Sequence, residues 1–321
     1  MKIDVLGVQV NTDTKNTIIF LIKKLLSEGQ KIFIVTPYSE MIVRAQKDEE
    51  FRNILNSAQF ALPDGAGILW AASFLKHKTH NMKQVSGFRF QVLWELFKSL
   101  TAIIFYPKYI RTVIPEKISG SDFIWDIARI AEDRGYSIFL LGGFDDTPDM
   151  AAKKLQEKFP NLRIAGILSP PREGELEGVA EQGQTITSPN PGVPQNSTQF
   201  WGGSLSSRGG GGIIEQINSS GADFLFVALG PIKQEKWIVQ HLERLNIRLA
   251  VGLGGTFDYL AGRRLLAPQI WRNLGLEWLW RLLTQPWRLW RISKGVLGLI
   301  WHTLKKMKPP SGKEAANRIW E

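Results

Sequence analysis

The sequence predicts an α/β fold in which a mainly parallel sheet carries helices on both faces. Short runs of apolar and β-branched residues alternate with stretches of helical periodicity, and several of the runs end in glycines. Strands that are separated by helices favour parallel pairing, because a helix-length connection returns the chain to the same end of the sheet. The 321 residues are 44% hydrophobic, which is enough to bury a sizeable core. We therefore expect a Rossmann-like α/β domain over residues 1–262.

The expected elements follow this rhythm along the chain. A helix around residues 17–27 ends at Glu28-Gly29, and a helix over 122–133 ends at Gly135, in the way that helices close on glycine. Two more helices are expected at 148–159 and directly after Gly230-Pro231. The strands are expected at 31–35, 137–141, 162–167, 223–229 and 248–252.

Two stretches interrupt the alternation, and we interpret them as insertions at 74–112 and 169–212. The second is rich in Gly, Pro, Ser, Gln and Thr, so it buries too little apolar surface to order itself and is expected to be disordered. The first is basic and aromatic. Its run 90–106 fits an amphipathic element at a membrane interface, and fits a helix packed on the core equally well.

The last quarter of the chain is strongly basic. Between Arg263 and Lys308, ten Lys and Arg residues stand against the single Glu277, which leaves +9 of the chain's net charge of +10. Half of the 12 Trp residues lie there too. Because Trp and Arg favour the headgroup zone of a membrane, we expect 263–308 to be a helical, membrane-associating appendage, followed by a flexible tail at 309–321. The alternative is a helical hairpin packed on the sheet.

Composition limits the partners and the compartment. The net charge of +10 favours anionic partners such as phosphate groups, acidic lipid or nucleic acid. The chain has no Cys, which excludes disulfides, a thiolate nucleophile and a Cys-ligated metal. No run of about 18 uncharged apolar residues predicts a spanning helix. Residues 1–6 carry Asp4 and lack the apolar core of a signal peptide, so we expect a cytoplasmic protein with peripheral membrane contact.

Glycines at the ends of predicted strands indicate a nucleotide or phosphate site. Gly142-Gly143 follows one strand, and Gly254-Gly255 follows another. Glycines there let a ligand approach the backbone, and the N-terminus of a following helix offers N–H groups to a phosphate. No dinucleotide fingerprint or Walker loop is present, so an ordinary tight turn explains any one of these junctions as well.

Two further blocks carry candidate side chains. Asp64, in Pro63-Asp64-Gly65, is placed to act as a general base, although the same tripeptide is a turn signature. Lys233 and Gln234 lie at the mouth of a predicted strand and suit phosphate and hydroxyl recognition, with a solvated first helical turn as the alternative. The chain has no Asp-x-Asp motif and only 4 scattered His residues, so we expect metal-independent chemistry and no cofactor.

Taken in order, several blocks of the chain resemble the WecG/TagA/CpsF family of bacterial glycosyltransferases, which is glycosyltransferase family 26. The resemblance covers most of the chain outside the two insertions and the tail, and the joint occurrence of the blocks is specific. The blocks are Val35-Thr36-Pro37 with Glu40, and residues 62–67, 118–122, 139–143, 221–223, 230–237, 254–262, 267–268 and 274–278.

The resemblance implies an inverting glycosyltransferase of cell-surface polysaccharide synthesis. Such enzymes transfer N-acetylmannosamine or a related sugar from a UDP-sugar donor to undecaprenyl-diphosphate-linked N-acetylglucosamine, at the inner face of the plasma membrane. By resemblance Asp64 is the general base, and Thr36 and Gln234 belong to the substrate pocket. Family members can oligomerise, so a homo-oligomer is a further expectation. The arginines that the resemblance assigns to diphosphate or headgroup contacts are Arg272, Arg281, Arg288 and Arg291.

Two residues depart from the family pattern. Tyr38 stands where members commonly have Asn, and Lys117 stands where an Arg usually precedes the Gly-x-Asp block. Tyrosine lacks the paired donor and acceptor of an amide, and lysine lacks the guanidinium fork. Both positions remain pocket candidates.

Two other functions stay open. One is a non-catalytic, membrane-associated protein that binds a nucleotide sugar on the same fold. The other is a nucleic-acid surface on the basic appendage, which would show steeply salt-dependent DNA binding. The clustered Trp residues argue against a nucleic-acid partner.

Overall fold

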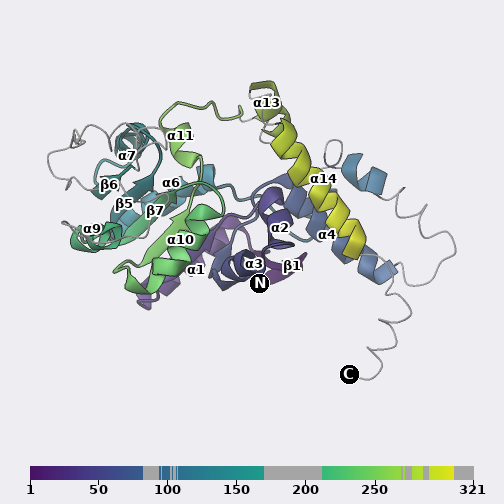
Figure 1. Cartoon of the computed structure of the whole chain (residues 1–321), viewed down its shortest axis with the longest axis horizontal. Coiled ribbons are helices and arrows are strands. Elements are labelled where there is room, and N and C mark those ends of the chain that lie inside the picture. Colours follow the sequence, from purple (N-terminus) through teal and green to yellow (C-terminus); the bar gives the residue numbers. More distant parts are fainter. Residues whose placement is uncertain are drawn as a thin grey trace, which may run out of the picture.

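The centre of the molecule is a parallel sheet. The computed structural model describes residues 1–81, 94, 96–101, 103, 106, 108–169, 212–268, 270–271, 277–284 and 289–306; the tail at 309–321 and nearly all of the second expected insertion lie outside this range. Six strands pair in the order β4-β3-β8-β7-β5-β6. Figure 1 labels three of them, β5, β6 and β7. They are β3 (Ile32–Val35), β4 (Phe60–Ala61), β5 (Ser137–Gly142), β6 (Arg163–Leu168), β7 (Phe224–Ala228) and β8 (Leu249–Gly252). The predicted α/β fold class is confirmed, and all five predicted strands are present.

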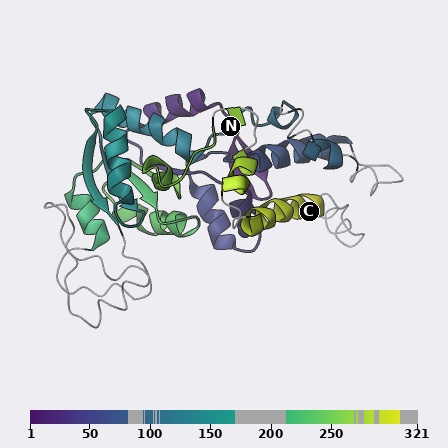
Figure 2. The same cartoon turned by 90° about the horizontal axis from the view of Figure 1, so that it is seen from above.

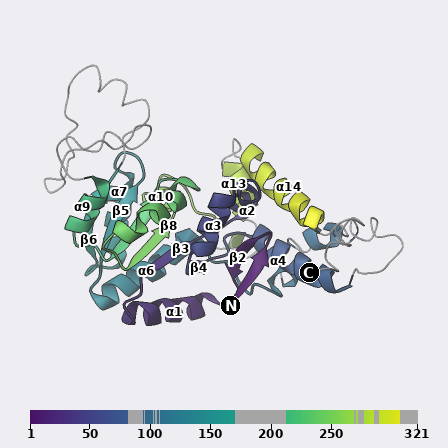
Figure 3. The same cartoon turned by 60° about the horizontal axis from the view of Figure 1, so that its bottom comes forward.

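Helices cover both faces of the sheet, because the side chains of each strand point alternately to either side. In β3, Ile32 and Ile34 pack against one helical layer, whereas Phe33 and Val35 pack against the other. Figure 3 shows α1 and α10 on opposite sides of the strands. The first layer contains α1 (Lys15–Ser27), α6 (Gly120–Arg134), α7 (Thr147–Lys158) and α11 (Thr256–Leu260). The second contains α3 (Glu49–Ser57), α9 (Ile213–Ser219) and α10 (Lys233–His241), so all four predicted helices are present.

Short-range sequence signals set the ends of these helices. The side chain of Thr14 accepts a hydrogen bond from the N–H of Thr17 at the start of α1, and Asp48 accepts one from the N–H of Phe51 at the start of α3. Each cap satisfies a backbone donor that the helix itself leaves without a partner. Gly135 ends α6 in the left-handed conformation, as its position in the sequence predicts.

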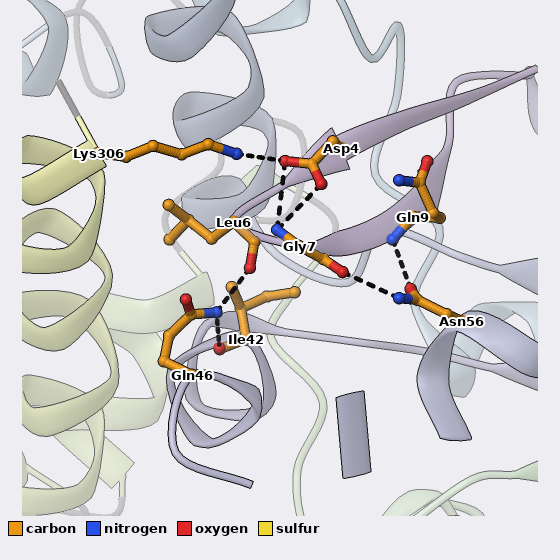
Figure 4. Close-up of polar contacts among 8 residues, drawn as sticks. All are labelled: Asp4, Leu6, Gly7, Gln9, Ile42, Gln46, Asn56 and Lys306. Carbon is orange, nitrogen blue, oxygen red and sulfur yellow. Dashed lines mark hydrogen bonds and ion pairs between the residues drawn. The ribbon is translucent and has the colours of Figure 1, made fainter. Parts of the chain in front are cut away.

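An antiparallel hairpin of β1 (Lys2–Val5) and β2 (Val8–Asn11) lies beside the sheet. Its turn is held by the following helices (Figure 4). The side-chain amide of Gln46, just after α2 (Ser39–Ala45), donates to the carbonyl of Leu6 at 2.7 Å. The amide of Asn56 in α3 donates to the carbonyl of Gly7 at 2.9 Å. This hairpin is absent from the sequence-based expectations, because its strands are too short to show a clear period.

The first expected insertion begins inside a helix. The helix α4 (Ala66–Asn81) runs through residue 74, and Phe74 is completely buried. Further along, the hydroxyl of Ser99 accepts a hydrogen bond from Nε1 of Trp70 at 2.9 Å, while Trp94 stays exposed. The described part of the segment 90–106 therefore packs one side on the core and presents aromatic surface on the other.

The C-terminal segment forms α13 (Glu277–Thr284) and α14 (Leu289–Lys306), and α14 lies along α2 and α4 (Figures 1 and 2). Two glycines bring α14 close to α2. A Cβ atom added to Gly295 would lie 3.3 Å from the backbone nitrogen of Glu40, and one added to Gly298 would lie 2.9 Å from Cγ1 of Val43. The helix α14 thus packs on helices rather than on the sheet itself.

The other side of α14 carries exposed apolar side chains. Val296, Leu297 and Trp301 are 41%, 65% and 64% exposed. At the end of the helix, Nζ of Lys306 forms an ion pair with Asp4 of β1 at 2.5 Å (Figure 4). No helix within the described ranges is long and apolar enough to cross a membrane.

Candidate active site

The predicted site residues of the α/β domain gather along one edge of the sheet. Because the six strands run parallel, their carboxyl ends lie at the same edge, which is where open α/β sheets bind ligands. In spatial order, Asp64 follows β4 and Thr36 follows β3. Next come Gly254 and Gly255 after β8, and Lys233 and Gln234 after β7. Gly142 and Gly143 lie at the end of β5. The topology therefore brings together blocks that are far apart in the sequence.

Asp64 lies on the loop between β4 and α4, and backbone hydrogen bonds join this loop to the loop after β3 and to the segment before α6. The N–H of Asp64 donates to the carbonyl of Pro37 at 2.9 Å, in the loop after β3. The N–H of Ile118 donates to the carbonyl of Pro63 at 2.9 Å. Asp64 itself is half-buried, and Gly65 has a φ of 107°. Gly65 therefore makes a left-handed bend between β4 and α4, and two backbone hydrogen bonds fix the position of the loop that carries Asp64.

Thr36 follows β3 directly and lies beside the start of α6. Its hydroxyl donates to the carbonyl of Gly252 at 3.4 Å. A Cβ atom added to Gly120, the first residue of α6, would lie 3.7 Å from Oγ1 of Thr36 and 3.5 Å from Oγ1 of Thr256. The partial positive charge of a helix N-terminus favours anionic groups at this point. Lys117, half-buried just before α6, belongs to the same edge.

The Gly142-Gly143 junction has a packing reason of its own. Gly142 has a φ of 105°, and a Cβ atom added to it would lie 2.5 Å from the carbonyl oxygen of Ala228. The N–H of Gly143 donates to that same oxygen at 3.1 Å. Only glycine fits such a close approach of β5 to β7, so strand packing accounts for Gly142, and phosphate binding at this junction stays a prediction.

Lys233 and Gln234 begin α10 but have different surroundings. Lys233 is exposed, whereas Gln234 is 3% exposed and its amide oxygen accepts a hydrogen bond from the N–H of Gly254 at 2.9 Å. The next residue, Glu235, is completely buried, and this burial raises its pKa to about 7. The expected solvated first turn therefore describes Lys233 alone. A direct contact of Gln234 with substrate stays a prediction.

The helix α14 reaches the same region of the molecule. A Cδ atom of Leu299 lies 3.4 Å from the place of a Cβ atom on Gly67, three residues after Asp64. Tyr38 precedes the first turn of α2, on which α14 packs, and its hydroxyl donates to Oε2 of Glu40 at 3.4 Å. The basic appendage is thus seated next to the loops that carry Thr36 and Asp64.

Comparison with known protein families gives a match over nearly the whole chain. The model described as "Glycosyl transferase WecG/TagA/CpsF family" matches residues 3–103 and 101–312. This chain belongs to the WecG/TagA/CpsF family. The predicted family and the predicted enzyme class, a glycosyltransferase, are thereby confirmed. The matched ranges include the sheet and the C-terminal helices α13 and α14.

Two curated relatives in the WecG/TagA/CpsF family carry the same name, N-acetylglucosaminyldiphosphoundecaprenol N-acetyl-beta-D-mannosaminyltransferase. A relative from Bacillus subtilis (strain 168) is 25% identical over 305 residues, which cover 95% of this chain and 90% of the relative. A relative from Staphylococcus aureus (strain MRSA252) is 22% identical over 294 residues, which cover 91% of this chain and 88% of the relative. The similarity therefore extends over almost the full length of each protein.

Sequence reasoning placed Arg264 in the appendage but missed its position at the sheet edge. A Cβ atom added to Gly255 would lie 3.3 Å from Nη1 of Arg264, and Nε of the same guanidinium forms an ion pair with Asp258 at 3.1 Å. The residue directly before it, Arg263, pairs with Asp145 at 3.6 Å. The signal in the sequence was the Arg-Arg pair that directly follows the family block ending at Gly262.

The four predicted appendage arginines are not tested by this structure. Arg272 and Arg288 lie outside the described residues. Arg281 falls in α13 and Arg291 in α14, but only their backbone positions are described. Their contacts to a diphosphate or to lipid headgroups stay predictions.

No metal site is evident in the part of the chain that the structure describes. Within it, no group of three or more His, Asp and Glu side chains is arranged to hold a metal ion. Metal-independent chemistry for this family member remains an expectation from the sequence.

Proposed function

We propose that this protein transfers an N-acetylmannosaminyl group, with inversion at the anomeric carbon, from a UDP donor to polyprenyl-diphosphate-linked N-acetylglucosamine. The name of these two relatives supports this acceptor and this sugar. The UDP donor and the inversion follow from the family resemblance of the sequence. The protein would act without a metal ion, at the inner face of the plasma membrane.

The placement of Asp64 is the observation that carries this proposal. Two backbone hydrogen bonds join its loop to the loop of Thr36 and to the segment that leads into α6. The residue is half-buried at the ligand-binding edge of the sheet, where a carboxylate can meet a substrate without being sealed in the core. A positioned carboxylate of this kind suits general-base catalysis.

In the proposed reaction, Asp64 accepts the proton of the acceptor hydroxyl while that oxygen bonds to the anomeric carbon. The bond from this carbon to the UDP oxygen breaks on the opposite face, so the configuration inverts. Negative charge develops on the departing diphosphate and needs stabilisation. The N-terminus of α6, Lys117 and Lys233 are candidates from the sheet edge, and the appendage arginines are candidates from the C-terminal segment.

The surface of α14 supports association with an anionic membrane. Its exposed Leu297 and Trp301 lie four residues apart on one side of the helix, with Lys294 and Lys305 in line with them. Apolar side chains flanked by cations suit the boundary between lipid headgroups and acyl chains. Docking on a membrane by this side would leave the other side of α14 packed on α2 and α4.

A donor screen tests the proposal. Purified protein is incubated with a polyprenyl-diphosphate N-acetylglucosamine analogue and a set of UDP-sugars, and both UDP release and the glycolipid product are measured. We expect product with UDP-N-acetylmannosamine, with the new anomer of opposite configuration by NMR. Donor binding without UDP release for every sugar would instead support the non-catalytic alternative.

The base assignment is tested in the same assay. Asp64→Asn should lose transfer by about a hundredfold or more, because the amide cannot accept the proton, while the thermal unfolding midpoint stays unchanged. Asp133→Asn, which changes an exposed carboxylate in α6, is the matched control and should keep the wild-type rate. Near-normal turnover of the Asp64 variant would refute its role as the base.

A further inference from the structure

Glu235 is a buried carboxylate that the proposed reaction does not use. Its side chain is 0% exposed, and both of its oxygens accept hydrogen bonds. Oε2 accepts from the N–H of Ile232 at 2.7 Å, and Oε1 accepts from Nε2 of Gln234 at 2.7 Å. The hydrogen bonds that favour its charged form come from amide groups, and burial opposes them. Such a group costs stability, so its presence calls for a reason beyond packing.

The bonds around Gln234 have a fixed direction. Its amide oxygen accepts from the N–H of Gly254 at 2.9 Å, so its amide nitrogen has to face Glu235. A rotated amide would set its NH₂ group against the N–H of Gly254 and its oxygen against the carboxylate. Three hydrogen bonds thus run in series from Ile232, through Glu235 and Gln234, to Gly254. We call this series the Glu235–Gln234 chain.

The Glu235–Gln234 chain joins two loops at the ligand-binding edge. Ile232 belongs to the turn after β7 and holds a φ of 73°, which is unfavourable for a β-branched residue, so its bond to Glu235 supports a strained backbone. Gly254 belongs to the loop between β8 and α11. Gly252, at the end of β8, lies against the chain: a Cβ atom added there would be 2.7 Å from Nε2 of Gln234. The carbonyl of Gly252 in turn accepts the hydroxyl of Thr36.

We propose that Glu235 is a positioning residue for sugar transfer: by orienting Gln234, it fixes the backbone of Gly254 and Gly255 against the diphosphate of the donor. This inference rests on the proposed function for the identity of the donor. The Glu235–Gln234 chain itself is a feature of the fold, so it can be tested without turnover.

An exchange of the two side chains tests the proposal. Glu235→Gln alone sets one NH₂ group against another, and Gln234→Glu alone sets a carboxylate against a carboxylate. The double variant Gln234→Glu/Glu235→Gln restores every donor and acceptor. In it, the amide now at position 235 accepts from Ile232 and donates to the carboxylate now at position 234, which accepts from Gly254. The exposed exchange Gln240→Glu/Glu243→Gln has the same composition change and is the matched control.

The first measurement is steady-state kinetics with UDP-N-acetylmannosamine and the lipid analogue. Each single variant should raise the donor KM by about tenfold, the equivalent of one good hydrogen bond, while the acceptor KM changes by less than about twofold. The double variant should return the donor KM to within about threefold of wild type. A role in folding alone would lower the active fraction without separating the two KM values. That result, or a double variant no better than the singles, would overturn the proposal.

The second measurement needs no turnover. Amide hydrogen exchange at Gly254 should accelerate by about tenfold in each single variant and slow again in the double variant. If the wild-type protein transfers no sugar, the proposed function fails and this exchange measurement decides the inference alone. Unchanged exchange at Gly254 in both single variants would refute it.

Gly252→Ala gives a second perturbation that keeps both side chains. Its methyl group would lie 2.7 Å from Nε2 of Gln234 and 2.9 Å from Oε1 of Glu235, so the amide has to move. The same rise in donor KM is expected here, and a wild-type donor KM would contradict the proposal even if the single variants fail to fold.

Discussion

The buried carboxylate of Glu235 makes stability depend on pH. Burial raises its pKa from the ordinary value of 4.5 to about 7 in the folded protein. Between these two values the folded state binds the proton and the unfolded state has lost it. The contribution of protonated Glu235 to the free energy of unfolding is therefore complete below pH 4.5 and is lost as the pH rises to about 7. At about 1.4 kcal/mol for each pH unit, the loss amounts to about 3 kcal/mol.

Comparison with Glu235→Gln isolates this effect from all other titrating groups. The substitution removes the ionisation and adds a constant cost of about 1–3 kcal/mol for the mismatched donors. The unfolding free energies of wild type and variant are measured by urea titration followed by Trp fluorescence. Between pH 4 and pH 8, the unfolding free energy of the wild type should fall by about 3 kcal/mol relative to that of the variant.

The matched control is Glu28→Gln, which changes a carboxylate with 43% side-chain exposure at the end of α1. Its unfolding free energy should stay within about 0.5 kcal/mol of wild type across the same pH range. Parallel curves for wild type and Glu235→Gln would refute the reasoning, because they would mean that Glu235 titrates alike in the folded and unfolded chains.

Three more outcomes follow from the contacts of α14 and from the site. Gly298→Leu should lower the unfolding free energy by about 1–3 kcal/mol and open α14 to trypsin, because the new side chain meets Val43, whereas Val296→Leu on the exposed side should change neither. The double variant Leu297→Glu/Trp301→Glu should weaken binding to vesicles of phosphatidylcholine and phosphatidylglycerol by more than about tenfold. The control Phe20→Glu changes an equally exposed side chain on α1 and should not weaken this binding. Equal losses of binding in both variants would contradict the assignment of this surface. Removal of divalent cations with EDTA should leave the transfer rate within about twofold, and a fall of about tenfold would show that a metal takes part.

The strands of the main sheet could be predicted from the sequence because each is a short, largely apolar run, and most of them end near a glycine. β4 could not, since its pairing covers Phe60 and Ala61 alone and rests on the neighbouring β3. The hairpin of β1 and β2 depends in the same way on Gln46 and Asn56, which hold its turn from other elements.

The site shows the same division. The parallel direction of the predicted strands is enough to bring Thr36 and Gly254 to one edge, so their shared edge could be predicted from the blocks and the fold class, whereas the place of Asp64 depends on β4. The burial of Gln234 could not, because a polar residue in a first helical turn is ordinarily solvated. This burial depends on Gly252, which has no side chain and so leaves the space that Gln234 and Glu235 fill. No local sequence pattern predicts that space.

The seat of α14 has a consequence for biosynthesis. The surface of α2 and α4 that receives this helix includes Val43 and Gly67, and its partner residues Gly298 and Leu299 lie more than 200 positions later in the chain. Because translation proceeds from the amino end, that surface stays uncovered on the ribosome until residues 289–306 have emerged. Stalled or shortened nascent chains would therefore display an uncovered apolar strip, the kind of surface on which chaperones act and from which aggregation starts.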